Sequence, residues 1–260
     1  MSIPDPLTNH RSIREYRSDP IPDDHLGEIL LAATRASSSG NMQTYSIIVT
    51  KDAERRKALW KMHFEQDMIL QAPVLLTFCV DWNRMNRWCR ASDAEPAYDN
   101  FLSFLVGFAD ALIAAQNAAL AAESLGYGIC YMGTTICSVP ELIDFFALPR
   151  DVFPATTLVV GMPNENPDLR ARLPMESIVH EEKYQNYDEA RIAETYRERE
   201  TEGWNRYMAF PELAEMIRES GVQNLAQVYT QVKYVQENNV KISRDLLEYL
   251  QRQGFLEHGE

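Results

Sequence analysis

The 260-residue chain lacks several features that would assign it a function at once. Its four cysteines are Cys79, Cys89, Cys130 and Cys137; no two have CxxC spacing, and no cysteine–histidine group has zinc-ligand spacing. We therefore predict no metal site, and we expect the cysteines to be thiols in a reducing compartment. Internal repeats and low-complexity tracts are also missing, so a repeat architecture is not expected.

Basic residues are scarce. The chain has 25 lysines and arginines against 38 aspartates and glutamates, a formal net charge of −13. Such a surface repels nucleic acid and anionic lipid, so neither is an expected partner. A site for an anionic ligand would have to be locally basic, which draws attention to the clustered arginines Arg11, Arg14, Arg170 and Arg172.

Segments typical of export or membrane insertion are not evident. The N-terminus has no apolar h-region and no signal cleavage pattern. The longest apolar stretch, residues 101–122, contains Asp110, Gln116 and Asn117, which favours a buried helix over a membrane span. We therefore expect a cytoplasmic protein without a membrane partner.

Strand and helix patterns alternate along the chain. β-branched and continuous apolar runs predict strands over residues 45–50, 73–80 and 156–161. Helical spacing and end signals predict helices over 23–36, 52–62, 103–125, 139–146, 188–202 and, finally, a short one around 246–254. Residues 82–99 have no clean period and are expected to be an irregular loop or broken helix. The alternation indicates an α/β or α+β fold around one sheet.

The stretch His10-Arg11-Ser12-Ile13-Arg14-Glu15-Tyr16 places two guanidiniums, a hydroxyl and an imidazole within five residues. A planar, permanently charged guanidinium makes paired, charge-assisted hydrogen bonds to phosphate. The stretch is therefore a candidate phosphate site. Taken alone, the stretch is more typical of a helix start with a solvated charge cluster.

Two glycine- and serine-containing segments could complete such a site. Residues 37–43 offer the hydroxyls of Ser38 and Ser39 and free backbone N–H groups that suit a phosphate or a ribityl chain. Residues 126–134 do not fit a Rossmann fingerprint, because the third glycine position is Tyr131 and the glycines follow a helix. Glycines there would instead let the backbone approach a flat ring. The alternatives are a helix-ending loop and a helix C-cap before a strand.

Arg170 and Arg172 share one face if their segment is extended, which suits an anion or the electron-rich edge of a reduced heterocycle. The alternative is a pair of exposed arginines that balance an acidic surface. The histidines His25, His63 and His258 lie in settings typical of surface or core histidines, and no nucleophilic triad is visible. Anion and ring contacts without acid–base residues suit a protein whose cofactor performs the reaction.

These segments, in this order, resemble the family of FMN-dependent nitroreductases and flavin reductases. The resemblance covers residues 7–184 and is strongest to the branch of oxygen-insensitive NADPH nitroreductases and the NADPH–flavin oxidoreductases of luminous bacteria. It implies an α+β sandwich around a mostly antiparallel sheet flanked by helices. It also implies a homodimer that buries the long central helix and holds two FMN molecules at its interface. We expect one such domain over residues 1–260, with 185–260 as a C-terminal helical arm that packs on the body or on the partner subunit.

The resemblance also assigns cofactor contacts. The residues of the first segment, 10–14, would hold the phosphate and ribityl end, and the two serines of residues 37–43 would add polar contacts. Gln66 would reach the polar edge of the ring, and residues 131–133 would lie along the ring. The arginines of residues 170–172 would face the phosphate or the pyrimidine side. The residues are His10, Arg11, Ser12, Arg14, Ser38, Ser39, Gln66, Tyr131, Met132, Gly133, Arg170 and Arg172. The chain departs from the branch in three places, where members often carry glycine, lysine and proline: Thr134, Arg170 and Ala171.

The function that the resemblance implies is a ping-pong transfer of hydride from NAD(P)H, through flavin N5, to a nitroaromatic, a quinone or free flavin. No residue of the protein need form a covalent bond. Arg199 and Arg206 are candidates for the 2′-phosphate of NADPH, although Glu198 and Glu200 flank Arg199. The alternatives are a specialised flavin enzyme of the same superfamily and an FMN carrier or sensor without turnover.

Overall fold

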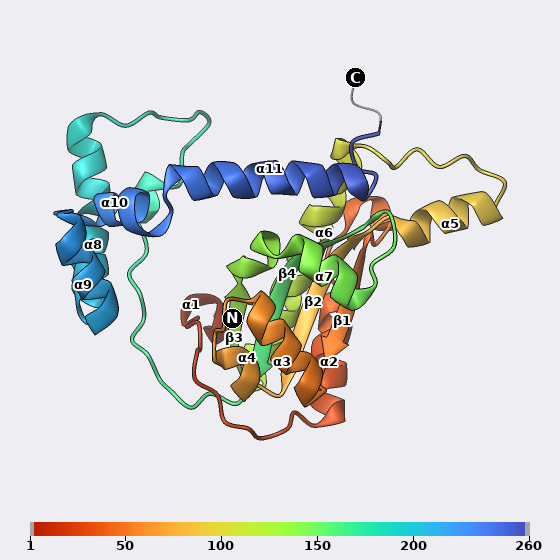
Figure 1. Cartoon of the computed structure of the whole chain (residues 1–260), viewed down its shortest axis with the longest axis horizontal. Coiled ribbons are helices and arrows are strands. Elements are labelled where there is room, and N and C mark those ends of the chain that lie inside the picture. Colours follow the sequence, from red (N-terminus) through yellow and green to blue (C-terminus); the bar gives the residue numbers. More distant parts are fainter. Residues whose placement is uncertain (1–2, 258–260) are drawn as a thin grey trace. The chain divides into compact units, whose positions relative to one another are not determined.

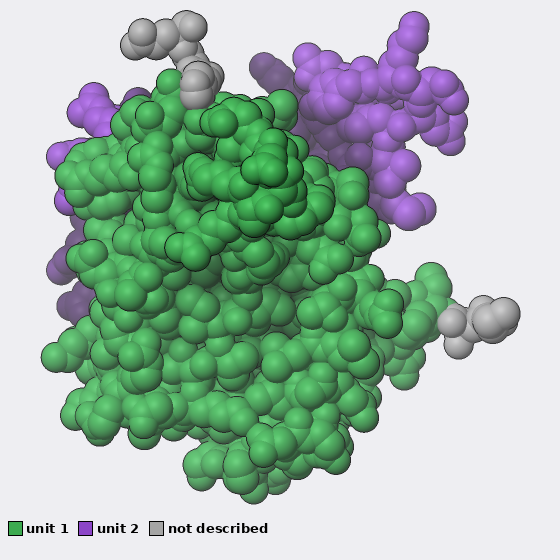
Figure 2. All heavy atoms as spheres, turned by 90° about the vertical axis from the view of Figure 1, so that its right-hand side faces the viewer, with its two compact units in different colours: residues 1–168, 245–260 green, residues 169–244 purple. Residues whose placement is uncertain are grey.

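The computed structural model describes residues 3–257 and divides into two compact units (Figure 2). Unit 1 comprises Met1–Asp168 and Asp245–Glu260, and unit 2 comprises Leu169–Arg244. Unit 1 contains the sheet and the large hydrophobic core, whereas unit 2 is helical. Each unit is described by itself below. The expected single domain over residues 1–260, with a helical arm from residue 185, stays a prediction.

Unit 1 is built around one four-stranded sheet (Figure 1). Its strands are β1 (Tyr45–Thr50), β2 (Val74–Asp81), β3 (Gly128–Met132) and β4 (Val152–Gly161). All neighbours are antiparallel, and the strand order is β1-β2-β4-β3. The predicted α+β class with an antiparallel sheet is thereby confirmed.

Strand β4 begins four residues before the sequence predicts, and a proline explains the difference. Pro154 lies inside β4, where it pairs with Cys79, while the next pair joins Phe78 to Thr156. Ala155 is therefore the extra residue of a β-bulge. Proline, which cannot donate to the ladder, is tolerated at such an irregularity.

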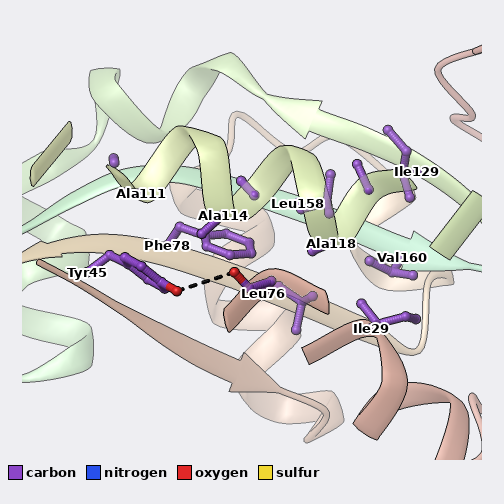
Figure 3. Close-up of a cluster of buried hydrophobic side chains, with 14 of the residues drawn as sticks. Ile29, Tyr45, Leu76, Phe78, Ala111, Ala114, Ala118, Ile129, Leu158 and Val160 are labelled. Carbon is purple, nitrogen blue, oxygen red and sulfur yellow. Dashed lines mark hydrogen bonds between the residues drawn. The ribbon is translucent and has the colours of Figure 1, made fainter. Parts of the chain in front are cut away.

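Two helices cover one face of the sheet. α2 (Asp23–Thr34) and the long α6 (Phe101–Ser124) pack against each other, and α6 packs on β2 and β4. Side chains that alternate along the strands, such as Leu76 and Phe78, point into this layer (Figure 3). Alanines of α6, including Ala111, Ala114 and Ala118, let the helix lie close to the sheet. Tyr45 in the same layer donates its hydroxyl to the carbonyl of Ala33.

The other face carries a second, smaller core. Strand residues of opposite parity, Leu75, Val159, Cys130 and Met132, are buried there. They pack under three helices: α3 (Ala53–Met62), α4 (Met68–Gln71) and α7 (Val139–Phe146). Helices thus lie on both faces of the sheet, in keeping with the expected sandwich.

The remaining elements of unit 1 are short. They are α1 (Asp5–Thr8), η1 (Ser39–Asn41), α5 (Asn83–Ala91) and η2 (Gly133–Cys137). Helix α5 lies within the stretch expected to be irregular, and residues 92–100 after it have no regular structure. The expectation of a broken helix therefore describes this segment better than that of a loop.

Unit 2 is helical and has a small core of its own, formed by Tyr207, Ile217, Val222, Leu225 and Val228. Its elements are η3 (Met175–Ser177), α8 (Glu189–Met208), α9 (Pro211–Ser220), α10 (Leu225–Gln227) and the π-helix η4 (Val228–Lys233). The last helix, α11 (Gln236–Arg252), belongs to both units and is much longer than the short helix that the sequence predicts.

Helix α6 has one buried and one exposed face, and both are apolar. Its exposed face includes Leu102, Leu105, Leu112 and Ile113, of which Leu102 is 70% exposed. By length and composition alone α6 could cross a membrane, and it is the one such helix among the described residues. Its other face, however, packs on the sheet and carries the buried Asp110, so we describe it as a core helix.

Candidate functional site

The predicted phosphate segment is extended, and it runs beside the start of β3. Ser12 forms a parallel β-bridge with Ile129, and the N–H of Ile13 donates to the carbonyl of Ile129 over 2.9 Å. A Cβ at Gly128 would lie 2.6 Å from a side-chain carbon of Ile13, so only glycine allows this approach. The sequence left open whether residues 10–16 form a phosphate site or the start of a helix. The helix start is wrong, because the segment is extended and pairs with β3.

Side chains of the extended segment alternate between two faces. Arg11 and Ile13 line a cavity of about 570 Å³ whose wall also includes Tyr127. By this alternation His10, Ser12 and Arg14 belong to the opposite face. The alternation therefore places three polar side chains of the motif on one face and Arg11 on the other, in a cavity whose wall also includes Glu123 and Glu165.

His10 and Ser12 are joined into a chain of hydrogen bonds that begins on α6. Glu123 Oε1 lies 2.6 Å from His10 Nδ1, and His10 Nε2 lies 3.5 Å from Ser12 Oγ. Arg14 is exposed, and its guanidinium donates to the carbonyl of Ser12 over 3.2 Å. Among the described residues, Arg14 has no ion-pair partner, so its charge is available to an anion.

Tyr131 lies further along β3 and points to α6. Its hydroxyl donates to Gln116 Oε1 over 3.3 Å. Burial, and secondly the charge of Glu123, raise the pKa of the Tyr131 phenol, so it stays protonated at neutral pH. Met132, the next residue, is buried in the core on the other face. Side chains of β3 therefore support the strand, and its backbone is what a ligand could reach.

The end of β3 meets the turn that carries Gln66. Gly133 is exposed, and a Cβ placed on it would contact no atom within 4 Å. Beside it, Thr134 Oγ1 lies 2.8 Å from Nδ1 of the buried His63. The side-chain amide of Gln66 in turn donates to the carbonyl of His63 over 3.0 Å. The structure thus brings Gln66 and Gly133, two predicted ring contacts, to one place.

Ser38 and Ser39 lie apart from these residues. The N–H of Ser39 donates to Oδ1 of Asp110 over 2.9 Å, and Ser38 Oγ accepts from the N–H of Gln43 over 3.2 Å. Asp110 and Glu123, the partner of His10, lie 13 residues apart on helix α6. They are therefore separated by about 20 Å along the helix axis. The two serines and His10 therefore do not form one compact cluster within a single chain.

Arg170 and Arg172 belong to unit 2, so their position relative to the residues above is not described. Within unit 2, Arg172 lines a cavity of about 450 Å³ together with Arg199, and Glu194, Glu198 and Glu202 balance the charge of that cavity. The arginine predicted to contact flavin and the one predicted to contact a nucleotide phosphate thus share one cavity.

Arg199 and Arg206 lie seven residues apart on α8, and both contact tyrosines. The Arg199 guanidinium donates to the Tyr229 hydroxyl over 3.1 Å, and the Arg206 guanidinium lies 5.3 Å from the ring centre of Tyr207. Lys233 donates to the Tyr207 hydroxyl over 3.2 Å. Burial favours the neutral phenol, but the hydrogen bond and charge of Lys233 outweigh it, and the pKa of Tyr207 is lowered.

The predictions from the sequence omitted three residues that hold this site together: Glu123, Asp110 and His63. Asp110 is the one that carried a signal, because it is the single charge within the apolar stretch of residues 101–122. Of the other histidines, His25 contacts the Tyr127 hydroxyl over 2.8 Å, and His258 lies outside the described residues.

The fold is an antiparallel α+β sandwich in which a basic, extended segment runs beside an accessible strand backbone. Residues 7–162 match the family model described as "Nitroreductase family". The chain belongs to the nitroreductase family.

Three known proteins illustrate the similarity. The chain is 36% identical over 237 residues to "FMN reductase [NAD(P)H]" of Bacillus subtilis, which covers 83% of this chain and 95% of the relative. It is 34% identical over 250 residues to "Oxygen-insensitive NADPH nitroreductase" of Salmonella typhimurium, which covers 96% of both chains. The solved structure of the NADPH:FMN oxidoreductase from Vibrio harveyi, complexed with NAD⁺, covers 97% of both chains with a TM-score of 0.75 and 26% identity.

Proposed function

We propose that the protein is an NAD(P)H-dependent FMN oxidoreductase that reduces a small-molecule acceptor such as a nitroaromatic, a quinone or free flavin. The observation that carries this proposal is the line of groups along β3: the basic segment at its start, and the open backbone of Gly133 beside Gln66 at its end. Relatives named for FMN reduction and nitroreduction match 83% and 96% of the chain, which supports the same activity here.

The residues present fit FMN. The exposed guanidinium of Arg14, with His10 and Ser12 on the same face, would hold the phosphate and ribityl end. The open space over Gly133 would admit the ring, and the side-chain amide of Gln66 would face its polar edge. Bound FMN would supply the redox chemistry, accepting hydride from NAD(P)H and passing two electrons on. The protein's own groups would bind and orient the cofactor, and the phenol of Tyr131 in β3 stays neutral.

A homodimer is part of the proposal. The exposed apolar residues of α6 form one face of the helix, a surface that monomeric proteins rarely leave in water. Ser38 and Ser39 are held at the middle of α6, about 20 Å along the helix from the partner of His10. A second copy packed on α6 would cover the apolar face and bring its own serines to this chain's basic segment.

Arg199, Arg206 and Lys233 are the cations that we assign to the nucleotide. The three cations gather beside Tyr207 and Tyr229, although the chain as a whole is acidic. Arg170 and Arg172 would face the flavin phosphate or its pyrimidine side. We place the protein in the cytoplasm, and its four free cysteines are in keeping with a reducing compartment.

The proposal is tested by the visible spectrum of the purified protein. We expect a yellow protein, or one that takes up FMN, whose absorbance is bleached by anaerobic NADPH or NADH and restored by a nitroaromatic or quinone. A colourless protein that does not take up FMN would overturn the proposal. A yellow protein that neither nucleotide bleaches would instead leave the FMN carrier, and bleaching without turnover of these acceptors would favour a specialised flavin enzyme.

Replacement of Arg14 tests the phosphate assignment. Arg14→Ala removes one charge-assisted, paired contact, which is worth roughly 1.5–3 kcal/mol, so FMN should bind about tenfold to a hundredfold more weakly. The measurement is a fluorescence titration of FMN into apoprotein. Arg17→Ala is the matched control, because Arg17 pairs with Asp19 and should leave FMN affinity unchanged. Equal affinities of the two variants would show that Arg14 does not hold the phosphate.

A further inference from the structure

His63 joins the two turns at the end of β3. It caps the C-terminus of α3, and its own N–H donates to the carbonyl of Leu59 over 2.9 Å. Its ring contacts Thr134 on the Gly133 turn over 2.8 Å, and its carbonyl accepts from the side chain of Gln66 over 3.0 Å. One residue therefore holds both segments that would contact the flavin ring.

The imidazole is an unusual choice for this position. It is fully buried, and its Nε2 has no hydrogen-bond partner among the described residues. An unpaired buried polar atom destabilises the folded protein, and leucine at this position would avoid that cost. Burial lowers the pKa of His63 to about 4, so the ring is neutral throughout the physiological range. The hydrogen bond to Thr134 is the contribution of His63 that offsets the cost of its unpaired Nε2.

The turn between His63 and Gln66 is strained, so it needs hydrogen bonds that hold it in place. Phe64 and Glu65 both have φ of 57°, in the left-handed region that favours glycine. Residues other than glycine are strained in this region, and they persist there only where neighbouring interactions hold them. The N–H of Glu65 is held by the carbonyl of Trp60 over 2.8 Å, and the Gln66 side chain closes the turn onto His63.

We infer that His63 is a positioning residue that, through its hydrogen bond to Thr134 and its carbonyl contact with Gln66, sets the reduction potential of the bound flavin. The inference rests on the proposed function and deepens it. Fixed hydrogen-bond donors beside a group that gains negative charge stabilise its reduced form more than its oxidised form. Loss of the hydrogen bond between His63 and Thr134 should therefore weaken the binding of reduced FMN more than that of oxidised FMN.

The test compares variants that keep the shape of the site. Thr134→Val removes the hydroxyl and keeps the branched side chain, Thr134→Ser keeps the hydroxyl, and His63→Leu removes the ring. We expect Thr134→Val and His63→Leu each to weaken reduced FMN about tenfold relative to oxidised FMN, which is about 30 mV for a two-electron couple. The double variant should show no further shift, because both changes break one bond. Thr134→Ser should retain the potential of the unaltered protein.

Ser138→Ala is the matched control. Ser138 donates its hydroxyl to the carbonyl of Met62 and so joins the same two segments without touching Thr134 or Gln66. It should lower stability and leave the potential unchanged. If Thr134→Val, like the control, lowers stability and leaves the potential unchanged, the role of the His63–Thr134 pair is structural and the inference is overturned. Should His63→Leu not fold, the valine and serine variants decide. A protein that binds no FMN would refute the proposed function, whereas one that binds FMN with an unshifted potential in Thr134→Val would refute this inference alone.

Discussion

Asp110→Ala is expected to lower the free energy of unfolding by about 3–5 kcal/mol, because a buried hydrogen-bond network is left without its acceptor. The carboxylate is 1% exposed and accepts from the Ser39 N–H over 2.9 Å and from the Thr44 hydroxyl over 2.9 Å. The Thr44 N–H lies 3.4 Å from the same carboxylate. Alanine would leave the buried Thr44 hydroxyl, and the N–H groups of Thr44 and Ser39, without this acceptor. The measurement is urea unfolding followed by circular dichroism.

The same variant should also weaken FMN binding, because Asp110 holds the segment that carries Ser38 and Ser39. The matched control is Asp144→Ala, which removes an exposed carboxylate from α7 and should change stability by no more than about 0.5 kcal/mol. Similar unfolding midpoints for the two variants would contradict the structural role of Asp110. Loss of stability without loss of FMN affinity would separate Asp110 from the cofactor site.

The strands and the long helices could be predicted because their patterns are local. Apolar runs in β1 and β2 and the alanine-rich stretch of α6 are visible within a few residues of sequence. Prediction fails where a local signal opposes the fold. Pro154 hides the first half of β4, since proline disfavours a strand, and the bulge that accommodates it depends on the partner strand. The polar start of α11 likewise gave no helical signal.

The candidate site shows the same limit more strongly. Residue type alone predicts the arginines as contacts of an anion, and the glycines and serines as contacts of a flat ligand. The residues that place them are distant in sequence: Glu123 is 113 positions from His10, and Thr134 is 71 positions from His63. Such pairs follow from tertiary packing and cannot be derived from spacing. The alternation that separates Arg11 from Arg14 could have been predicted, had the segment been recognised as extended.

Acid should destabilise the protein through His63 well before most carboxylates are protonated. The pKa of this imidazole is lowered by burial from its ordinary value of 6.5 to about 4. The unfolded chain therefore takes up a proton below pH 6.5 that the folded chain refuses, and the free energy of unfolding falls as the pH drops from 6.5 towards 4. We expect a loss of about 2 kcal/mol between pH 7 and pH 5 from this one residue. Above pH 7 the contribution of His63 should be constant.

The contribution is isolated by comparing unfolding curves of the unaltered protein and His63→Gln at pH 7 and pH 5. Glutamine does not titrate, so the variant should lose about 2 kcal/mol less over this interval, although it is less stable at neutral pH. His25→Gln is the matched control, because it replaces a half-buried histidine that contacts Tyr127 and leaves His63 in place. This variant should keep the acid dependence that His63 causes. Parallel losses in all three proteins would show that His63 titrates normally and is therefore accessible to water. A site whose ring-facing turns are tied by a charged, hydrated imidazole could not act as the fixed support that we infer, so this measurement bears on the flavin site as well as on stability.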